Sequence, residues 1–171
     1  MNAIDSITLP ADFTIGYLGA GQLARMSALQ AFRYGFSIAV ASNRDETEPV
    51  EQMTPKAFKV NFNDAGSMAE FASTCDVLTL ENEFIDGAIL QQLVDDSGVP
   101  MYPAPASFKM IENKFIEKKT FEDAGIPVTP YKIVKTADDL ETFGAEHGWP
   151  YLLKSSKGGY DGYGNVTVSS K

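Results

Sequence analysis

The first hundred residues alternate between short apolar runs and segments with apolar residues at helical spacing. The apolar run 14–19 passes into a glycine turn at 19–21, as expected for a buried strand that leads directly into a helix. Apolar residues then recur at steps of three, at Leu23, Met26, Leu29 and Phe32. Gly35 and a second apolar run, 36–41, follow. This order predicts a strand, a glycine turn, a helix that ends at Gly35, and a second strand.

The same alternation continues to about residue 102. Asp64 and Asp86 are typical N-cap residues, and Gly98 is typical of a helix C-terminus. The elements predicted here are a strand at 57–60, a helix from Asp64 to Cys75, a strand at 76–80, a helix from Asp86 to Gly98, and a short strand at 99–102. Strands that alternate with helices favour a parallel, doubly wound sheet of the α/β class.

Pro103 and Pro105 interrupt this alternation, so we predict one domain over 1–103 and a second over 104–171. The second domain is predicted to contain a helix at 107–124, a strand at 131–134, a helix from the capping box Thr136–Asp139 to Gly148, and strands at 150–154 and 166–168. Ending on a strand would leave sheet edges and apolar faces uncovered. We therefore expect the N-terminal part of a longer protein, or a chain that needs a partner.

Composition and charge exclude several classes of protein. The 171 residues are 44% hydrophobic and 22% charged, as in a packed globular protein. The net charge of −9 has the wrong sign for a general nucleic-acid or anionic-membrane binder. Cys75 is the single cysteine, so no internal disulfide can form. No apolar run approaches the ~20 residues that span a bilayer. These features predict a cytoplasmic protein with no membrane or nucleic-acid partner.

The glycine turn is the first candidate for chemistry. Gly19, Gly21 and Ala24 fit the pattern G-x-G-x-x-G/A between a strand and a helix, where backbone N–H groups receive a phosphate. Three interpretations stay open: a dinucleotide site, a site for another phosphorylated ligand, or a turn that needs glycine for its backbone alone. A dinucleotide site is disfavoured, because the second strand runs into 42–44 and an acid follows only at Asp45.

A second glycine-rich segment, 154–165, is the most informative part of the chain. It holds four glycines, two tyrosines and an aspartate between two predicted strands, with Lys154 and Lys157 beside them. Glycines let a backbone close on phosphates, and a lysine on a strand can meet a phosphate. The segment is not a Walker loop, because it lacks G-x-x-x-x-G-K-[ST] and no helix follows. The alternative is a glycine-rich hairpin turn.

Four motifs occur in one order: G-Y-L-G-A-G-Q-L-A-R-M at 16–26, T-L-E-N-E at 79–83, Asn113-Lys114 with Lys118, and K-S-S-K-G-G-Y-D-G-Y-G-N at 154–165. In this combination the chain resembles the 5-(carboxyamino)imidazole ribonucleotide synthases, the ATP-grasp ligases of purine biosynthesis. The resemblance extends from Phe13 to Lys171 and covers about the first half of such an enzyme.

The resemblance implies a Rossmann-like pre-ATP-grasp domain followed by the beginning of an ATP-grasp domain. It implies an enzyme that uses ATP, Mg²⁺ and bicarbonate to form carboxyphosphate and then carboxylates aminoimidazole ribonucleotide. Ligands of the metal are expected outside this chain, no catalytic residue is assigned within it, and these residues alone are expected to be inactive. A homodimer with contacts in the N-terminal domain is also implied.

The same resemblance implies the site residues. Gly21, Gln22 and Glu81 are candidates for binding the ribonucleotide, and Phe84 stands where the family usually has asparagine. The candidates for binding ATP are Lys114, Lys154, Gly159, Tyr160, Asp161, Gly162, Tyr163, Gly164 and Asn165. Asn165 replaces a glutamine that is frequent in the family.

Other polar residues are interpreted as structural. We expect Cys75 to pack at a helix end, His147 to cap the last turn of a helix, and Lys118 and Lys119 to lie on a solvated helix face. Two further hypotheses remain: a different ATP-grasp carboxylate-amine ligase, and a non-catalytic fragment that serves binding or assembly.

Overall fold

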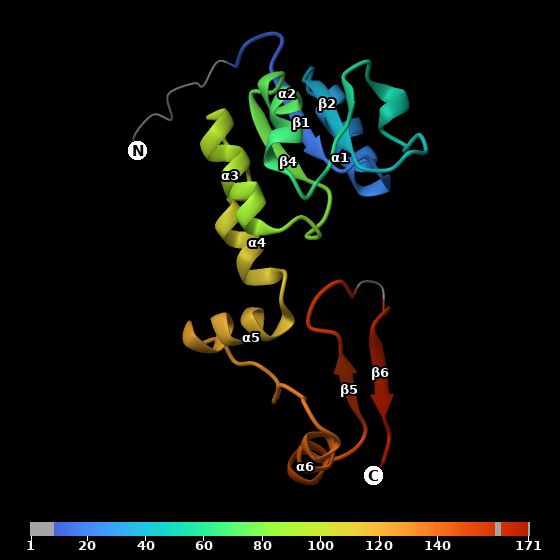
Figure 1. The fold of residues 1–171 in the computed structure, drawn as a ribbon, viewed down its shortest axis with the longest axis vertical. Coiled ribbons are helices and arrows are strands. Elements are labelled where there is room, and N and C mark those ends of the chain that lie inside the picture. The colour runs from blue at the N-terminus through green and yellow to red at the C-terminus, as the bar shows by residue number, and fades with distance from the viewer. Residues whose placement is uncertain (1–8, 160–161, 171) are drawn as a thin grey trace. The chain divides into compact units, whose positions relative to one another are not determined.

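The computed structural model describes residues 9–159 and 162–170. The chain divides into two compact units between Ala106 and Ser107 (Figure 1). Each unit has a sheet of its own.

The first unit is built around a four-stranded sheet in the order β3-β2-β1-β4, with all neighbours parallel. Its elements are β1 (Thr14–Leu18), α1 (Gln22–Arg33), β2 (Ser37–Ser42), η1 (Glu51–Met53), β3 (Ala57–Lys59), η2 (Ala65–Met68), α2 (Ala69–Ser73), β4 (Val77–Leu80) and α3 (Gly87–Ser97). The predicted α/β class with a parallel sheet is confirmed. The strand predicted at 99–102 is reduced to one parallel bridge between Leu78 and Met101.

Predicted caps place several of these helices. Gly66 N donates to Asp64 Oδ1 at 2.9 Å, and Ala88 N donates to Asp86 Oδ1 at 2.7 Å. Gly98 ends α3 with a left-handed φ of 68°. The single helix predicted after Asp64 is wrong, because the chain first makes a 3₁₀ turn, η2, that contains Gly66, a poor helix former.

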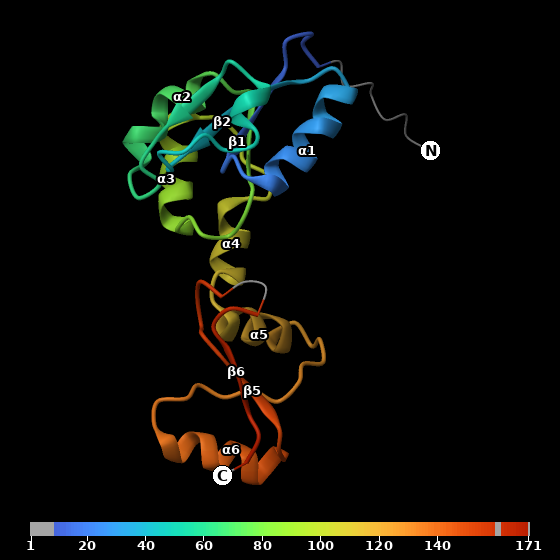
Figure 2. The same ribbon diagram turned by 90° about the vertical axis from the view of Figure 1, so that its right-hand side faces the viewer.

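Helices cover both faces of this sheet: Figure 2 shows α1 on one face and α2 and α3 on the other. The side of α1 that is buried consists of Ala24, Ala28 and Ala31. The larger apolar residues that revealed the helix in the sequence are exposed: Leu23, Met26, Leu29 and Phe32. The helix was predicted correctly, but its buried face is the alanine side, where small side chains let the helix lie close to the sheet.

The carboxyl ends of the strands gather three loops at one edge of the sheet. Gly19 N donates to Ala41 O of β2 at 2.9 Å, and Glu81 N donates to Leu18 O of β1 at 3.0 Å. Val50 N, in the loop after β2, donates to Ala20 O at 3.0 Å. In open parallel sheets this edge is where ligands bind, and the glycine turn lies in its middle.

The second unit contains two helices and an antiparallel hairpin, and a third helix crosses the boundary between the units. Its elements are α5 (Lys114–Asp123), α6 (Ala137–His147), β5 (Tyr151–Lys154) and β6 (Asn165–Val168), and α4 (Pro105–Ile111) leads into it. Lys154 and Asn165 pair at the end of the hairpin that carries the glycine-rich loop.

Two predictions for this unit are wrong. The helix predicted at 107–124 is divided into α4 and α5, because Asn113 takes an extended conformation and its side chain accepts from Phe115 N and Ile116 N. The strand predicted at 131–134 is absent from the described residues, and this segment runs as irregular chain. Its side chains bind helices instead: Tyr131 packs edge-on against Phe115, and Lys132 pairs with Asp139 at 3.1 Å.

Within the described part of the chain, no helix has the length and apolar character needed to cross a membrane.

Candidate functional site

The first unit has a cleft of about 650 Å³ at the carboxyl edge of its sheet. The glycine turn, the loop after β2 and the loop after β4 form its walls. Gly21, Gln22 and Glu81, the three residues expected on the ribonucleotide side, all line it. Motifs about 60 residues apart in the sequence therefore lie at one site, because β1 and β4 are neighbours in the sheet.

Glu81 connects the two motifs directly. Its Oε2 accepts from Gly21 N at 2.8 Å, and its Oε1 accepts from Leu23 N at 3.1 Å. Glu81 and Glu83 do not extend side by side from a strand, since β4 ends at Leu80. Glu81 is half-buried against the glycine turn, whereas Glu83 is exposed.

The loop after β2 is fixed by ionic contacts. Lys59 Nζ donates to Arg44 O at 2.6 Å, to Glu46 O at 3.1 Å and to Glu51 Oε1 at 2.7 Å. Arg44 in turn lies 3.5 Å from Glu48 Oε1. Arg44 and Glu48 line the cleft, so this network shapes the wall opposite β4. No sequence motif indicates this role of Lys59.

Phe84 also lines this cleft and is 53% exposed. Its aromatic ring offers a flat apolar surface at this position.

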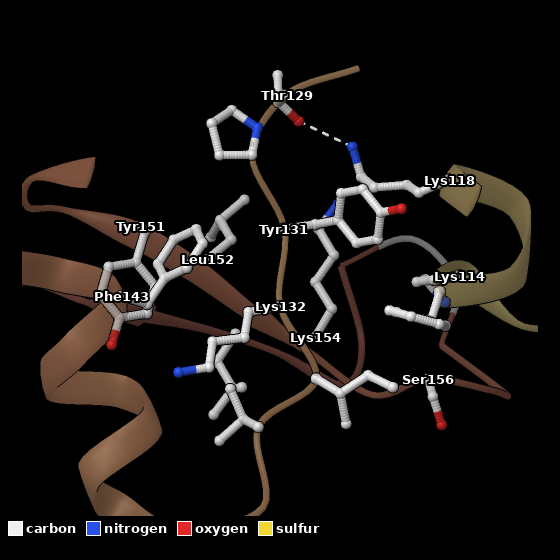
Figure 3. A pocket seen from close by; sticks show the side chains of 15 residues that line it. Lys114, Lys118, Thr129, Tyr131, Lys132, Phe143, Tyr151, Leu152, Lys154 and Ser156 are labelled. Carbon is white, nitrogen blue, oxygen red and sulfur yellow. Dashed lines mark hydrogen bonds between the residues drawn. The ribbon is translucent and has the colours of Figure 1, made fainter. Parts of the chain in front are cut away.

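The second unit has a separate cleft of about 500 Å³, shown in Figure 3. Its aromatic and aliphatic lining comprises Phe115, Tyr131, Ile133, Val134, Phe143, Tyr151, Leu152 and Leu153. Four lysines also line it: Lys114, Lys118, Lys132 and Lys154. An apolar cleft edged with cations is suited to a planar base attached to phosphates.

The four lysines differ in the hydrogen bonds and ion pairs that their side chains already make. Lys118 Nζ donates to Thr129 Oγ1 at 2.8 Å, and Lys132 pairs with Asp139. Lys114 Nζ makes one long hydrogen bond, 3.4 Å, to Gly159 O. The Lys154 ammonium group has no hydrogen bond or ion pair with another described residue. The two lysines predicted to bind ATP are thus the two that remain available to a ligand.

Lys118 is misplaced in the sequence interpretation, because it lines the cleft instead of lying on a solvated face. Its ammonium lies 5.8 Å from the centre of the Tyr131 ring. Lys119 does lie on the exposed face, where it pairs with Asp123 at 2.5 Å. The hydrogen bond with Asp123 raises the pKa of Lys119.

The glycine-rich loop closes on itself next to Lys114. Ser155 N donates to Gly164 O at 2.8 Å. A Cβ on Gly159 would lie 2.7 Å from Tyr163 O and 3.4 Å from Lys114 Nζ, and a Cβ on Gly164 would collide with Ser155 Oγ. Both glycines are therefore required by close packing. Gly162 and Tyr163 belong to the same loop and Asn165 begins β6, whereas Tyr160 and Asp161 lie outside the described residues.

The sequence interpretation missed two polar residues beside this cleft. Desolvation is the main cause that raises the pKa of Tyr131, and the hydrogen bond to Glu122 raises it further. Backbone N–H groups of Lys135 and Thr136, together with Lys132, hold the pKa of Asp139 well below its ordinary value. Asp139 was identified as part of a capping box, which is confirmed, but nothing in the sequence connected it with Lys132.

Cys75 and His147 take structural positions. Cys75 is buried directly after the end of α2, as expected, and burial raises the pKa of its thiol to about 11. His147 is the last residue of α6 and its ring lies 4.7 Å from that of Phe143. Among the described residues, no three His, Cys, Asp or Glu side chains gather as ligands of a metal ion.

The geometry therefore comprises a glycine-turn cleft on a parallel sheet and a lysine-edged cleft beside a glycine-rich hairpin. A family model described as the ribonucleotide synthetase preATP-grasp domain matches residues 13–112, more than half of the chain. The chain belongs to this ribonucleotide synthetase family. A model of the ATP-grasp domain matches residues 119–171. The predicted family and the predicted fold class are both confirmed.

Named members of this ribonucleotide synthetase family are similar over most of the chain. The chain is 35% identical to phosphoribosylaminoimidazole carboxylase of Ogataea methanolica and 32% identical to N5-carboxyaminoimidazole ribonucleotide synthase of Bacillus subtilis, over 92% of its length in both cases. A crystal structure of N5-carboxyaminoimidazole synthase from Aspergillus clavatus, in complex with ADP and 5-aminoimidazole ribonucleotide, superposes with a TM-score of 0.79 at 29% identity over 94% of this chain.

The chain spans only part of each of these relatives. It covers 30% of the Ogataea protein, 40% of the Bacillus protein and 41% of the Aspergillus chain. Relatives of this ribonucleotide synthetase family therefore contain much sequence that has no counterpart among these 171 residues.

Proposed function

We propose that the chain serves in the ATP-dependent carboxylation of 5-aminoimidazole ribonucleotide with bicarbonate, as the N-terminal part of an ATP-grasp carbon–nitrogen ligase. The observation that carries this proposal is the placement of Lys114 and Lys154 at one apolar cleft beside the glycine-rich hairpin. The Aspergillus relative holds ADP and 5-aminoimidazole ribonucleotide together, which supports the pairing of these two ligands here.

In the proposed reaction, a bicarbonate oxygen attacks the γ-phosphorus of ATP, and the bond between that phosphorus and the oxygen bridging to the β-phosphate breaks. The products are ADP and carboxyphosphate. The amine of the ribonucleotide then attacks the carboxyl carbon, loses a proton and releases inorganic phosphate. Little covalent chemistry falls to the protein in such a transfer, so positioning and neutralisation of charge dominate.

This chain supplies two parts of that arrangement. Lys114 and Lys154 place ammonium groups where they neutralise phosphate charge, and the apolar lining receives the base. The hairpin loop 155–164 covers the phosphates and excludes water, which protects an intermediate that water would destroy. Tyr160 and Asp161 are proposed to belong to this cover.

The ribonucleotide is proposed to bind in the cleft of the first unit, against Gly21, Gln22 and Glu81. The position of this cleft at the carboxyl edge of a parallel sheet supports the assignment. The ring of Phe84 would pack against this ligand.

Mg²⁺ dependence, a cytoplasmic location and a homodimer complete the proposal. Mg²⁺ is the usual companion of ATP phosphates and is held chiefly by oxygen ligands, which we propose to be supplied outside residues 1–171. The exposed apolar face of α1 supports contact between two copies of the chain through the first unit. Domains over 1–103 and 104–171 remain our proposed division.

The test is ADP release by the protein as its gene encodes it, with ATP, Mg²⁺ and bicarbonate, with and without 5-aminoimidazole ribonucleotide. We expect strong stimulation by the ribonucleotide, and loss of it when bicarbonate is omitted. ADP release that ignores this ribonucleotide but responds to another amine or acid would indicate a different ATP-grasp ligase. No ATP turnover under any of these conditions would favour the non-catalytic alternative.

A further inference from the structure

Glu81 occupies the position that a phosphate takes in a glycine turn of this kind. The N–H groups of Gly21 and Leu23 lie at the N-terminus of α1, where they have no partner within the helix. Such groups commonly receive a phosphate. Here both donate to one carboxylate of the protein itself, at 2.8 and 3.1 Å. The carboxylate also satisfies the positive end of the dipole of α1.

The glycines of the turn make room for this same side chain. A Cβ on Gly21 would collide with Glu81 Oε1 and would lie 3.0 Å from Oε2. A Cβ on Gly19 would lie 2.7 Å from both Cβ and Oε2 of Glu81. The nearest atoms in both cases belong to Glu81 alone. The glycine spacing therefore fits the carboxylate of the residue that follows β4, with no need for an external phosphate.

The charges in the cleft also disfavour a phosphate at the glycine turn. Among the described residues that line it, Arg44 is the one basic side chain, against the carboxylates of Glu48 and Glu81. Arg44 comes from the loop after β2 and already pairs with Glu48 at 3.5 Å. A phosphate that reached Gly21 N would have to lie beside the Glu81 carboxylate, which forms no ion pair with a described residue and repels an anion.

We infer that Glu81 is a built-in anion that fills the glycine turn and excludes phosphate groups from it. Glu81 is thus a specificity and positioning residue: it prevents the pyrophosphate of a dinucleotide from binding in the manner that the G-x-G-x-x-A pattern suggests. One consequence rests on the proposed function: the 5′-phosphate of the bound ribonucleotide lies away from the N-terminus of α1, either in another part of the cleft or outside it.

The first test is a double-mutant cycle between Gly21 and Glu81, read as the midpoint of thermal unfolding of the whole protein. Gly21 has a φ of −81°, so alanine costs no backbone strain there. Gly21→Ala is expected to lower the midpoint by several degrees when Glu81 is present, and by much less in a Glu81→Ala background. The matched control is Glu70→Ala on α2, which should leave the cost of Gly21→Ala unchanged. An equal cost in all three backgrounds would overturn the inference.

The second test needs no substitution at Glu81. Inorganic phosphate is titrated into isotopically labelled wild-type protein while the amide signals of Gly21 and Leu23 are followed by NMR. We expect these two signals to stay in place, and saturable shifts of both would overturn the inference. Where Glu81→Ala folds, the same titration is expected to shift them. Neither test involves ATP or the ribonucleotide, so failure of the proposed function and failure of this inference are distinguishable.

Discussion

Lys154 and Lys114 are the residues on which the ATP proposal depends most. All four residues of β5, Tyr151–Lys154, line the lysine-edged cleft, with Lys154 at the end next to the glycine-rich loop. Lys114 is the first residue of α5, directly after the N-cap Asn113. A helix N-terminus and the end of a strand thus bring two ammonium groups from separate elements to the same cleft.

Replacing Lys154 with methionine should weaken ATP binding while the fold persists. A hydrogen bond to a charged group contributes about 1.5–3 kcal/mol, so the dissociation constant for ATP is expected to rise about 10- to 100-fold. Binding is measured by calorimetry on the full-length protein. Lys119→Met is the control: it removes an equal charge from an exposed ion pair with Asp123, and should leave ATP affinity unchanged. Unaltered affinity in Lys154→Met would remove this lysine from the site.

At the level of single residues, the sequence pointed to residues in motifs but not to their partners. Gly21 and Glu81 were both identified, but the hydrogen bonds that join them depend on β1 and β4 being neighbours in the sheet. Lys118 was assigned to a solvated face because its own helix offers acids nearby. The irregular segment that carries Thr129 and Tyr131 covers it instead, and no local pattern contains that contact.

At the scale of elements, local chemistry predicted the ends of helices better than their lengths. The capping box of α6 is present in both directions: Asp139 N donates to Thr136 Oγ1 at 3.3 Å, and Thr136 N donates to Asp139 Oδ2 at 3.0 Å. The segment 131–134 has the alternation of a strand but pairs with no described strand, since β5 and β6 pair with each other. Alternation is a local property, whereas a strand also needs a partner.

The Asp139 carboxylate should make the stability of α6 depend on pH. Its pKa is 3.8 in an unperturbed chain and lower in the folded protein. The contribution is therefore complete above the unfolded pKa and is lost as pH falls through the folded pKa. Asp139→Asn is expected to lower the midpoint of thermal unfolding by about 2–5 °C near pH 7.

The difference between wild type and Asp139→Asn should shrink steadily below about pH 4. Circular dichroism at a series of pH values measures it. Asp138→Asn removes the same charge at the preceding residue, whose side chain is not one of the two that form the capping box, and should have a smaller effect. A difference that is constant from neutral pH to below pH 4 would contradict the role assigned to the charge of Asp139.

At the scale of the whole molecule, α1 joins the site to the outer surface of the first unit. Its N-terminus holds the turn that Glu81 fills, and its alanine side packs on the sheet. Its other side exposes large apolar residues, with Leu23 61% and Met26 58% accessible. A net charge of −9 opposes association through the charged surface. A second copy can cover this face, because a twofold interface requires only that the patch be complementary to itself.

We predict that Leu29→Glu, in the middle of this face, converts the full-length protein from a dimer to a monomer. A buried carboxylate without a partner costs several kcal/mol, which is enough to raise a dimer dissociation constant by at least about a hundredfold. Light scattering coupled to size-exclusion chromatography measures the mass. Gln92→Glu introduces the same charge at an exposed position of α3, on the other face of the sheet, and should leave the dimer intact. If Leu29→Glu remains dimeric but loses thermal stability, another segment of the protein covers α1 and the proposed interface is wrong. Because the N-terminus of α1 lies at the turn that Glu81 fills, a confirmed interface would also place the partner subunit on the helix that begins at this turn.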